Sequence, residues 1–265
     1  MTDTLLANEP LIRIGFFLSV LTVMAAWEAV AARRPQRIGR LTRWPSNLLI
    51  VVLDTLAVRL VFPLAAVGAA YMASKNGWGL LNIVTLPGWL AVIIAVLMLD
   101  AAIYFQHRLF HTVPWLWRLH RMHHADLEFD VTTGLRFHPI EIVLSMAIKL
   151  TMVLALGAPA LAMVIFEVLL NATSMFNHGN VRLPLWLDKR LRLVVVTPDM
   201  HRVHHSVIVR ETNSNFGFNL PWWDRLFGTY RDQPEKGHLG MTIGIEDFRT
   251  EQDLRLDRML IQPFR

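Results

Sequence analysis

Residues 100–124 read DAAIYFQHRLFHTVPWLWRLHRMHH, and in this stretch the end of an apolar segment runs directly into clustered histidines. With a later repeat of the H-x-x-H-H spacing, eight of the chain's eleven histidines fall into three short clusters: His107, His111, His120, His123, His124, His201, His204 and His205. Positions i, i+3 and i+4 of a helix lie on one face, so the members of each cluster point the same way. Imidazoles at this spacing suit a first-row transition metal. Three such clusters favour a metal site over unrelated surface or core histidines.

The composition around the histidines indicates a membrane protein. Of the 265 residues, 54% are hydrophobic and only 18% are charged. Five apolar stretches are long enough, or nearly so, to cross the ~30 Å of hydrocarbon in a bilayer: Leu11–Ala32, Leu48–Ala73, Pro87–Phe105, Ile140–Leu156 and Ala160–Phe176. We therefore predict an all-α fold, a polytopic membrane helix bundle with four or five transmembrane helices in a single domain of residues 1–265. The sequence leaves open whether residues 140–176 cross fully or form a re-entrant hairpin.

Basic residues predict the orientation of this bundle. Five arginines follow the first apolar stretch, and loops rich in arginine and lysine stay on the cytoplasmic side: Arg33, Arg34, Arg37, Arg40 and Arg43. All histidine clusters then lie on this side, whether or not residues 140–176 cross fully. We predict a cytoplasmic helical cap that carries the histidine site, with residues 125–138 as an irregular polar connection. The net charge of +5 fits anionic lipid headgroups, and we expect no nucleic-acid partner.

The imidazoles are too many for one metal ion. A zinc ion takes four ligands, whereas two metal ions with open coordination positions would use about this many. The chain has no cysteine, which excludes disulfides, thiolate ligands and iron–sulfur clusters and leaves histidine and carboxylate as ligands. The pattern therefore predicts a histidine-rich di-metal site, of the kind in which iron with open positions activates O₂.

Two further histidines and several carboxylates are candidates for the same site. His138 lies just before an apolar stretch and His178 just after one, so both are candidate ligands. His238, between two glycines, is expected on the solvated surface. A metal-bound histidine donates its second N–H to a carboxylate or carbonyl. Asp100 is the preferred catalytic-site carboxylate, because a carboxylate deep in an apolar span needs a partner. Other carboxylates close in sequence are Asp126, Glu128, Asp130, Asp199 and Asp224.

Seven motifs occur in an order that resembles a known family. They are Asp100–His111, Leu119–His124, Arg136–Pro139, Asn177–Asn180, Pro198–His205, Asn215–Gly217 and Trp223–Thr229. Together they resemble the fatty acid hydroxylase superfamily, also called the sterol-desaturase-like family, over roughly residues 95–232 as the catalytic region. The resemblance implies a membrane-embedded di-iron site that uses O₂ and externally supplied electrons. It also implies that the eight clustered histidines are metal ligands, with His138 and His178 as further ones.

The resemblance implies a class of reaction. Members of the family hydroxylate or desaturate sterols, sphingoid bases, fatty acyl chains or carotenoids, or cleave alkylglycerol ethers. We therefore expect a membrane-bound oxygenase that hydroxylates a lipid of one of these types, with a lipid desaturase as the alternative. The family's fused cytochrome b5 module has no counterpart here, which implies a separate electron donor, a ferredoxin or cytochrome supplied by an NAD(P)H reductase. Zinc in a purified sample would reflect metal exchange in a strong imidazole site.

Functions of other classes fit the sequence less well. A metal transporter would place its ligands along a pathway near the bilayer midplane, whereas these gather at one membrane face. A zinc hydrolase would use a motif such as H-E-x-x-H, which is absent. We expect an apolar substrate to arrive laterally from the bilayer along a path lined by aromatic residues: Phe105, Phe110, Phe137, Phe166 and Phe176. We expect an acidic electron donor to dock on arginines near the clusters: Arg108, Arg121, Arg202 and Arg210.

Overall fold

The structure, a computed structural model, describes residues 8–265 and contains no β-strand in that range. Its longer helices are α2 (Glu9–Val30), α3 (Arg40–Val61), α4 (Ala66–Asn76), α6 (Gly88–Thr112), α7 (Pro114–His124), α8 (Pro139–Leu156) and α9 (Ala160–Asn177). The shorter ones are α5 (Leu80–Ile83), η1 (Thr133–Leu135), α10 (Leu185–Leu191), α11 (Pro198–His204), α12 (Val209–Thr212), α13 (Trp222–Leu226), α14 (Gly237–Gly240), η2 (Glu251–Leu254), α15 (Leu256–Ile261) and η3 (Gln262–Phe264). The predicted all-α class is confirmed.

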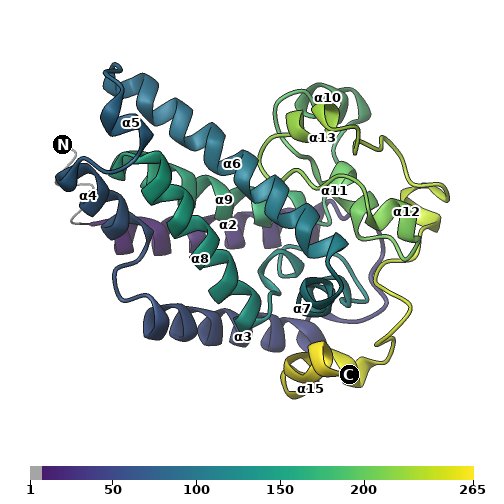
Figure 1. Cartoon of the computed structure of the whole chain (residues 1–265). Helices are drawn as coiled ribbons and strands as arrows, with labels where there is room; N and C mark the ends of the chain where they lie inside the picture. Colours follow the sequence, from purple (N-terminus) through teal and green to yellow (C-terminus); the bar gives the residue numbers. More distant parts are fainter. Residues whose placement is uncertain (1–7) are drawn as a thin grey trace.

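The long helices form a bundle whose outer surface is apolar. Five helical segments have the length and composition to cross a membrane: Pro10–Val30, Arg40–Ile83, Gly88–Thr112, Pro139–Leu156 and Ala160–Asn177. In Figure 1 these helices lie beside one another, while α7 and α10–α15 gather at one end of the bundle as a cap. Many large hydrophobic side chains on the spans are exposed, as contact with lipid requires. The chain is therefore a multi-pass membrane protein.

The second apolar stretch is not one helix. We predicted a single span over Leu48–Ala73, but α3 ends at Val61 and α4 begins at Ala66. Pro63 causes the break, because a proline disfavours helical backbone at the residue before it. That residue, Phe62, has φ −126° and ψ 79°. After the break, α4 packs against α8 and α9 at the end of the bundle farthest from the cap.

The predicted hairpin between α8 and α9 is present, and its turn depends on a glycine. Gly157 ends α8 in the left-handed conformation, with φ 66°. A Cβ atom there would lie 2.4 Å from the carbonyl oxygen of Trp78, so the two backbones approach this closely only because the side chain is absent. Pro159 then precedes α9, whose start it favours through its fixed φ.

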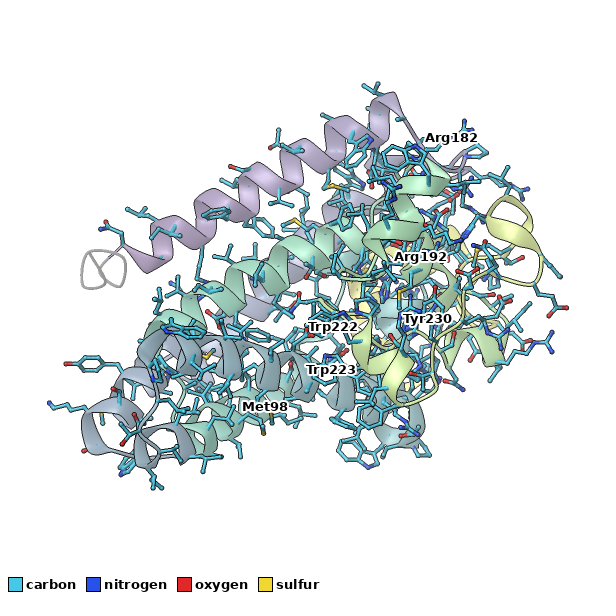
Figure 2. All side chains as sticks on the ribbon, turned by 90° about the horizontal axis from the view of Figure 1, so that it is seen from above. Met98, Arg182, Arg192, Trp222, Trp223 and Tyr230 are labelled. Carbon is cyan, nitrogen blue, oxygen red and sulfur yellow. The ribbon has the colours of Figure 1, made fainter. Side chains whose placement is uncertain are left out.

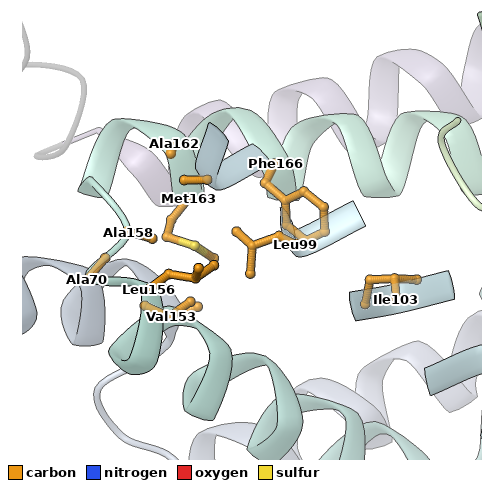
Figure 3. Close-up of a cluster of buried hydrophobic side chains, with 11 residues drawn as sticks. Ala70, Leu99, Ile103, Val153, Leu156, Ala158, Ala162, Met163 and Phe166 are labelled. Atoms are coloured by element: carbon orange, nitrogen blue, oxygen red, sulfur yellow. The ribbon is translucent and has the colours of Figure 1, made fainter. Parts of the chain in front are cut away.

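A cluster of buried hydrophobic residues holds α4, α6, α8 and α9 together (Figure 3). Leu99, Met163 and Phe166 are its largest fully buried members, with Ala70 and Ala162 as small residues that let the helices approach closely. Phe166 therefore belongs to the core. This packing fixes the positions of α6 and α9, which carry histidines at their cap ends.

Residues 125–138 are irregular, as predicted, but they are buried rather than solvated. Arg43 of α3 reaches into this connection and pairs with Asp126 (2.7 Å) and Asp130 (2.6 Å). All three side chains are fully buried. The connection folds inward because Arg43 supplies partners for carboxylates that would otherwise need water. Arg43, one of the five arginines that predict the cytoplasmic side, is thus an internal ion-pair partner.

Candidate metal centre

Four helix ends deliver the histidines to the cap side of the bundle. His107 and His111 lie near the end of α6, and α7 carries the first H-x-x-H-H cluster. His178 follows α9 directly, and α11 with its C-cap residue carries the second cluster. Pro114 and Pro198 stand at the first positions of α7 and α11, where proline is favoured, so the chain can turn sharply before each cluster.

The histidines form two neighbouring groups of ring nitrogens. Within each group, one nitrogen from every histidine lies within 4.8 Å of the others. The five-histidine group contains His107, His111, His120, His124 and His204. The four-histidine group contains His123, His178, His201 and His205. The groups touch, since the rings of His124 and His205 stack with centroids 4.4 Å apart.

Both H-x-x-H-H clusters are divided between the two groups. In α7, the i and i+4 residues His120 and His124 point into the five-histidine group, and His123 points into the other. In the second cluster the assignment is reversed, with His204 in the five-histidine group and His201 and His205 in the four-histidine group. Each helix therefore contributes histidines to both groups and holds the two together.

The four-histidine group has the spacing of a metal coordination sphere. The Nε2 atom of His178 lies 3.2 Å from Nε2 of His123, 3.1 Å from that of His201 and 3.2 Å from that of His205. A neutral imidazole nitrogen is either one donor or one acceptor, so it is unable to satisfy three others. Metal–nitrogen bonds of ~2.0–2.1 Å at right or tetrahedral angles separate adjacent nitrogens by roughly 2.9–3.4 Å. The observed separations match a shared metal ion.

The five-histidine group has buried nitrogens without protein partners. Among the described residues, no hydrogen bond reaches Nε2 of His111, His120 or His204, or either ring nitrogen of His124. Buried polar atoms are almost always satisfied, and each orphan costs free energy. A metal ion would satisfy several of these atoms at once, so the donor set fits a metal here as well.

The opposite ring nitrogens hold the histidines in orientation. The Nδ1 atoms of His107, His178 and His204 lie 2.7–2.8 Å from the backbone carbonyl oxygens of Phe216, Ser174 and Ser214 respectively. A carbonyl only accepts, so each Nδ1 carries the proton. The Nε2 lone pair is then free to bind a metal.

His120 and His111 are oriented by side chains that the sequence reasoning missed. Glu141 of α8 accepts from Nδ1 of His120 at 2.6 Å, and Asn213 lies 3.3 Å from Nδ1 of His111. Glu141 is buried and lies in a predominantly apolar helix. Like Asp100, Glu141 is a carboxylate in an apolar span that needs a partner.

The surroundings keep the imidazoles neutral. Burial lowers the pKa of His178 and of His204 to about 3, although each gains a hydrogen bond to a carbonyl that acts in the opposite direction. Burial, together with the neighbouring imidazoles, also lowers the pKa of His123, His124 and His205 well below the ordinary value. Neutral rings have the lone pair that metal binding requires.

Asp100 and His138, two of the predicted site residues, lie outside both groups. The carboxylate of Asp100 accepts from Trp223 Nε1 (2.8 Å) and from the backbone N–H groups of Asn219 and Leu220 (both 3.3 Å). Asp100 therefore anchors the loop before α13. Among residues 8–265, it makes no hydrogen bond to a histidine. His138 caps α8 through Ile140 N, and its Nε2 lies 3.2 Å from the carbonyl oxygen of Leu260.

Three other expectations from the sequence need correction. His238 is not on the solvated surface; it is 5% exposed and its Nε2 lies 3.6 Å from Asp199. Arg202 is fully buried and pairs with Asp199, so it is not available to dock an electron donor. Among the aromatic residues, Phe137 stacks on the ring of His123 at 4.5 Å, which places it beside the site rather than along a path through the spans.

Comparison with known proteins identifies the family. The profile of the fatty acid hydroxylase family matches residues 92–229, more than half of the chain. Ornithine lipid hydroxylase of Rhizobium tropici is 33% identical over 146 residues, which cover 54% of this chain and 42% of that protein. Human alkylglycerol monooxygenase is 27% identical over 159 residues, which cover 58% and 34%. Cholesterol 25-hydroxylase of Rattus norvegicus is 28% identical over 151 residues, which cover 56% and 49%.

These similarities leave much of each relative unmatched. The chain spans between a third and a half of the length of these curated relatives. No solved structure matches it. The match of the family profile, which runs through every histidine of both groups, shows that the chain belongs to the fatty acid hydroxylase family.

Proposed function

We propose that this protein is a membrane-bound, O₂-dependent di-iron oxygenase that hydroxylates a lipid. The observation that carries the proposal is the pair of touching groups, with nine buried imidazoles between them, at one end of an apolar helix bundle. Two groups of nitrogen ligands fit two metal ions, whereas a single four-coordinate metal ion would use fewer than half of these nine histidines. Asp100 and His138 are not ligands in this proposal.

The residues of the chain have separate roles. The five-histidine and four-histidine groups would each hold one iron ion, and the iron pair would supply O₂ activation when bound. The Nδ1 partners, Glu141 among them, fix the tautomer and direction of each ring. Burial of the rings excludes water, which protects an oxidising site from side reactions. Asp100 positions the loop that presents the carbonyl of Phe216 to His107.

The substrate is inferred to be an amphiphilic lipid. The relatives are named for ornithine lipid, alkylglycerol and cholesterol as their substrates. These three molecules share an apolar body with a small polar group. A site at the end of membrane spans suits such a molecule, because its tail can stay among apolar helices. A lipid desaturase with the same metals is the second candidate, since hydroxylation and desaturation differ in where the C–H bond lies.

The position of the histidine groups at one end of the bundle also bears on the source of electrons and on the side of the membrane that the cap faces. We infer that the cap faces the cytoplasm and that a separate one-electron donor, a ferredoxin or cytochrome served by an NAD(P)H reductase, delivers electrons there. Arg108 and Arg210 are exposed near the cap end of α6 and on α12, and they remain candidates for docking an acidic donor.

An isotope experiment on iron-loaded protein tests this function. Protein purified in mild detergent and loaded with iron is supplied with lipid extract, reductant and ¹⁸O₂, and the products are analysed by mass spectrometry. A hydroxylase adds one ¹⁸O atom to the lipid, whereas a desaturase removes two hydrogen atoms and adds none. His124→Asn is expected to abolish product, and His138→Asn, outside both groups, to retain it. Full turnover by His124→Asn would contradict the proposal.

A further inference from the structure

Two segments of the cap expose an unusual amount of apolar surface. One is α10 with the turn that follows it, and the other is α13 with its C-cap residue. Their large hydrophobic side chains are between 40% and 74% exposed: Leu185, Trp186, Leu193, Val194, Trp222, Leu226 and Phe227. We call these seven residues the interfacial patch. An apolar surface of this kind outside the spans indicates a contact with another molecule or with lipid.

The two segments form one surface held by hydrogen bonds. Trp222 donates from Nε1 to the carbonyl oxygen of Leu193 at 2.7 Å. Arg225 donates to the carbonyl oxygen of Arg192 at 3.1 Å, and Arg192 is itself paired with Asp188 at 2.7 Å. Figure 2 shows Arg192 and Trp222 on adjoining ribbons. The interfacial patch therefore keeps its shape without a partner.

The patch continues the lipid-facing side of a membrane span. The ring of Phe227 contacts the ring of Phe105 on α6, with centroids 5.0 Å apart. Phe105 and Met98 are each 43% exposed on α6, which is one of the five candidate spans. Trp223, beside Trp222, donates to Asp100 at the middle of α6, and Figure 2 shows it close to that helix. The patch thus lies level with the part of α6 that enters the bilayer.

Most of the exposed charges around the patch are cationic; the exception is Asp232, whose exposed carboxylate pairs with Arg192 at 3.0 Å. Arg182, Lys189, Arg190 and Arg225 are exposed on or next to the two segments. The guanidinium of Arg190 lies 5.6 Å from the ring centroid of Trp186. Asp188 is buried against Arg192, and so adds no negative charge at the surface. Apolar and tryptophan side chains flanked by cations are typical of a segment lying in the headgroup region of an anionic membrane.

We propose that the interfacial patch is inserted into the bilayer leaflet that faces the cap and binds anionic phospholipid headgroups. This membrane contact is additional to the spans and does not depend on the proposed enzymatic function. It makes α10 and α13 monotopic elements of a multi-pass protein. A docked protein partner is the competing occupant, and the experiment below separates the two.

The absence of cysteine from the sequence makes a direct test simple. Single variants Leu193→Cys and Leu226→Cys are labelled with a nitroxide and reconstituted in phosphatidylcholine nanodiscs with or without phosphatidylglycerol. Collision with O₂, which concentrates in lipid, is compared with collision with a water-soluble nickel chelate. Met98→Cys in the span is the lipid reference. Val209→Cys on α12 is the water reference, because that residue is 69% exposed on a part of the cap beyond α11 in Figure 1.

The expected result is that labels at Leu193 and Leu226 resemble the Met98 label, with several-fold lower nickel accessibility than the Val209 label. Adding phosphatidylglycerol should lower nickel accessibility further, and Lys189→Gln with Arg190→Gln should remove that additional effect. Labels as accessible to nickel as the Val209 label in both lipid mixtures would overturn the proposal and leave the patch to a protein partner. Immersion that is independent of phosphatidylglycerol would overturn the binding of anionic headgroups.

Discussion

Glu141 illustrates how one side chain outside the metal groups can control a ligand. Its carboxylate accepts from Nδ1 of His120, and both side chains are buried. A carboxylate makes the ring it contacts a stronger ligand and fixes its direction. We expect Glu141→Ala to weaken metal binding about 10–100-fold and Glu141→Gln, which can still accept at its amide oxygen, to weaken it less. Competition with a chelator measures this, and equal affinity in both variants and the unaltered protein would contradict it.

The division of ligands between the groups predicts selective metal loss. His111→Asn removes a ligand from the five-histidine group alone, and His178→Asn removes one from the four-histidine group alone. His178→Asn should bind about half the metal of the unaltered protein, because its group keeps only three histidines while the other keeps its full set. His111→Asn leaves four histidines in its group and should lose less metal. Elemental analysis after dialysis measures the stoichiometry, with His138→Asn as the control. Unchanged metal content in His178→Asn would remove the four-histidine group from the site.

At the scale of elements, an ion pair joins α3 to the connection that follows α7. Arg43 pairs with Asp126 and Asp130, and all three are fully buried. Replacing Arg43 with methionine leaves two buried carboxylates uncompensated, so we expect a loss of about 3–5 kcal/mol in the free energy of unfolding. Arg59→Met, an exposed arginine on the same helix, should change it by less than about 0.5 kcal/mol. Thermal unfolding in detergent compares the two, and equal stability would show that the ion pair contributes little.

The same ion pair gives the protein a defined sensitivity to acid. Burial alone would raise the pKa of Asp126, but Arg43 outweighs it and lowers the pKa from 3.8 to about 2. The lowered value means that the stabilisation is fully present above pH 3.8 and is lost as the pH falls through 2. Its size is about 2 kcal/mol. Unfolding measured between pH 4 and pH 2 should show this loss in the unaltered protein and not in Asp126→Asn; parallel curves for the two would contradict the assignment.

The sequence predicted the helices better than it predicted which side chains pair between them. The length of an apolar stretch is a property of the local sequence. The five spans and the α8–α9 hairpin could therefore be predicted from the sequence. Helical spacing also predicted that the histidines of each cluster lie at one site, but not that each H-x-x-H-H cluster is divided between two groups. The division of His123 from His124, and the pairing of Arg43 and Glu141, depend on which helices pack together. Pro63 alone could have predicted the break between α3 and α4. The apolar residues on both sides of it instead indicated one long span.

At the scale of the whole molecule, the arginines after the first span predict which side of the membrane the cap faces. The arginines that predicted a cytoplasmic cap also stabilise it, since Arg33 pairs with Asp199 and Arg34 donates to the carbonyl oxygen of Met241. Both roles are compatible, because charges held against the cap still resist translocation. We expect Val209→Cys to react with an impermeant maleimide only after cells are permeabilised, and Lys75→Cys to react in intact cells. The reverse pattern would place the cap outside the cytoplasm.

The divided ligand sets have a consequence for how the protein is made. The five-histidine group needs residues from 107 to 204, and the four-histidine group needs residues from 123 to 205. A ribosome must therefore synthesise all five spans and the second H-x-x-H-H cluster before either group has every ligand. Any metal ions that these groups hold would then be loaded after translation of this region, into a chain whose helices are already inserted. A nascent chain halted before residue 201 would hold four of five histidines of one group and two of four of the other, so neither group would be complete.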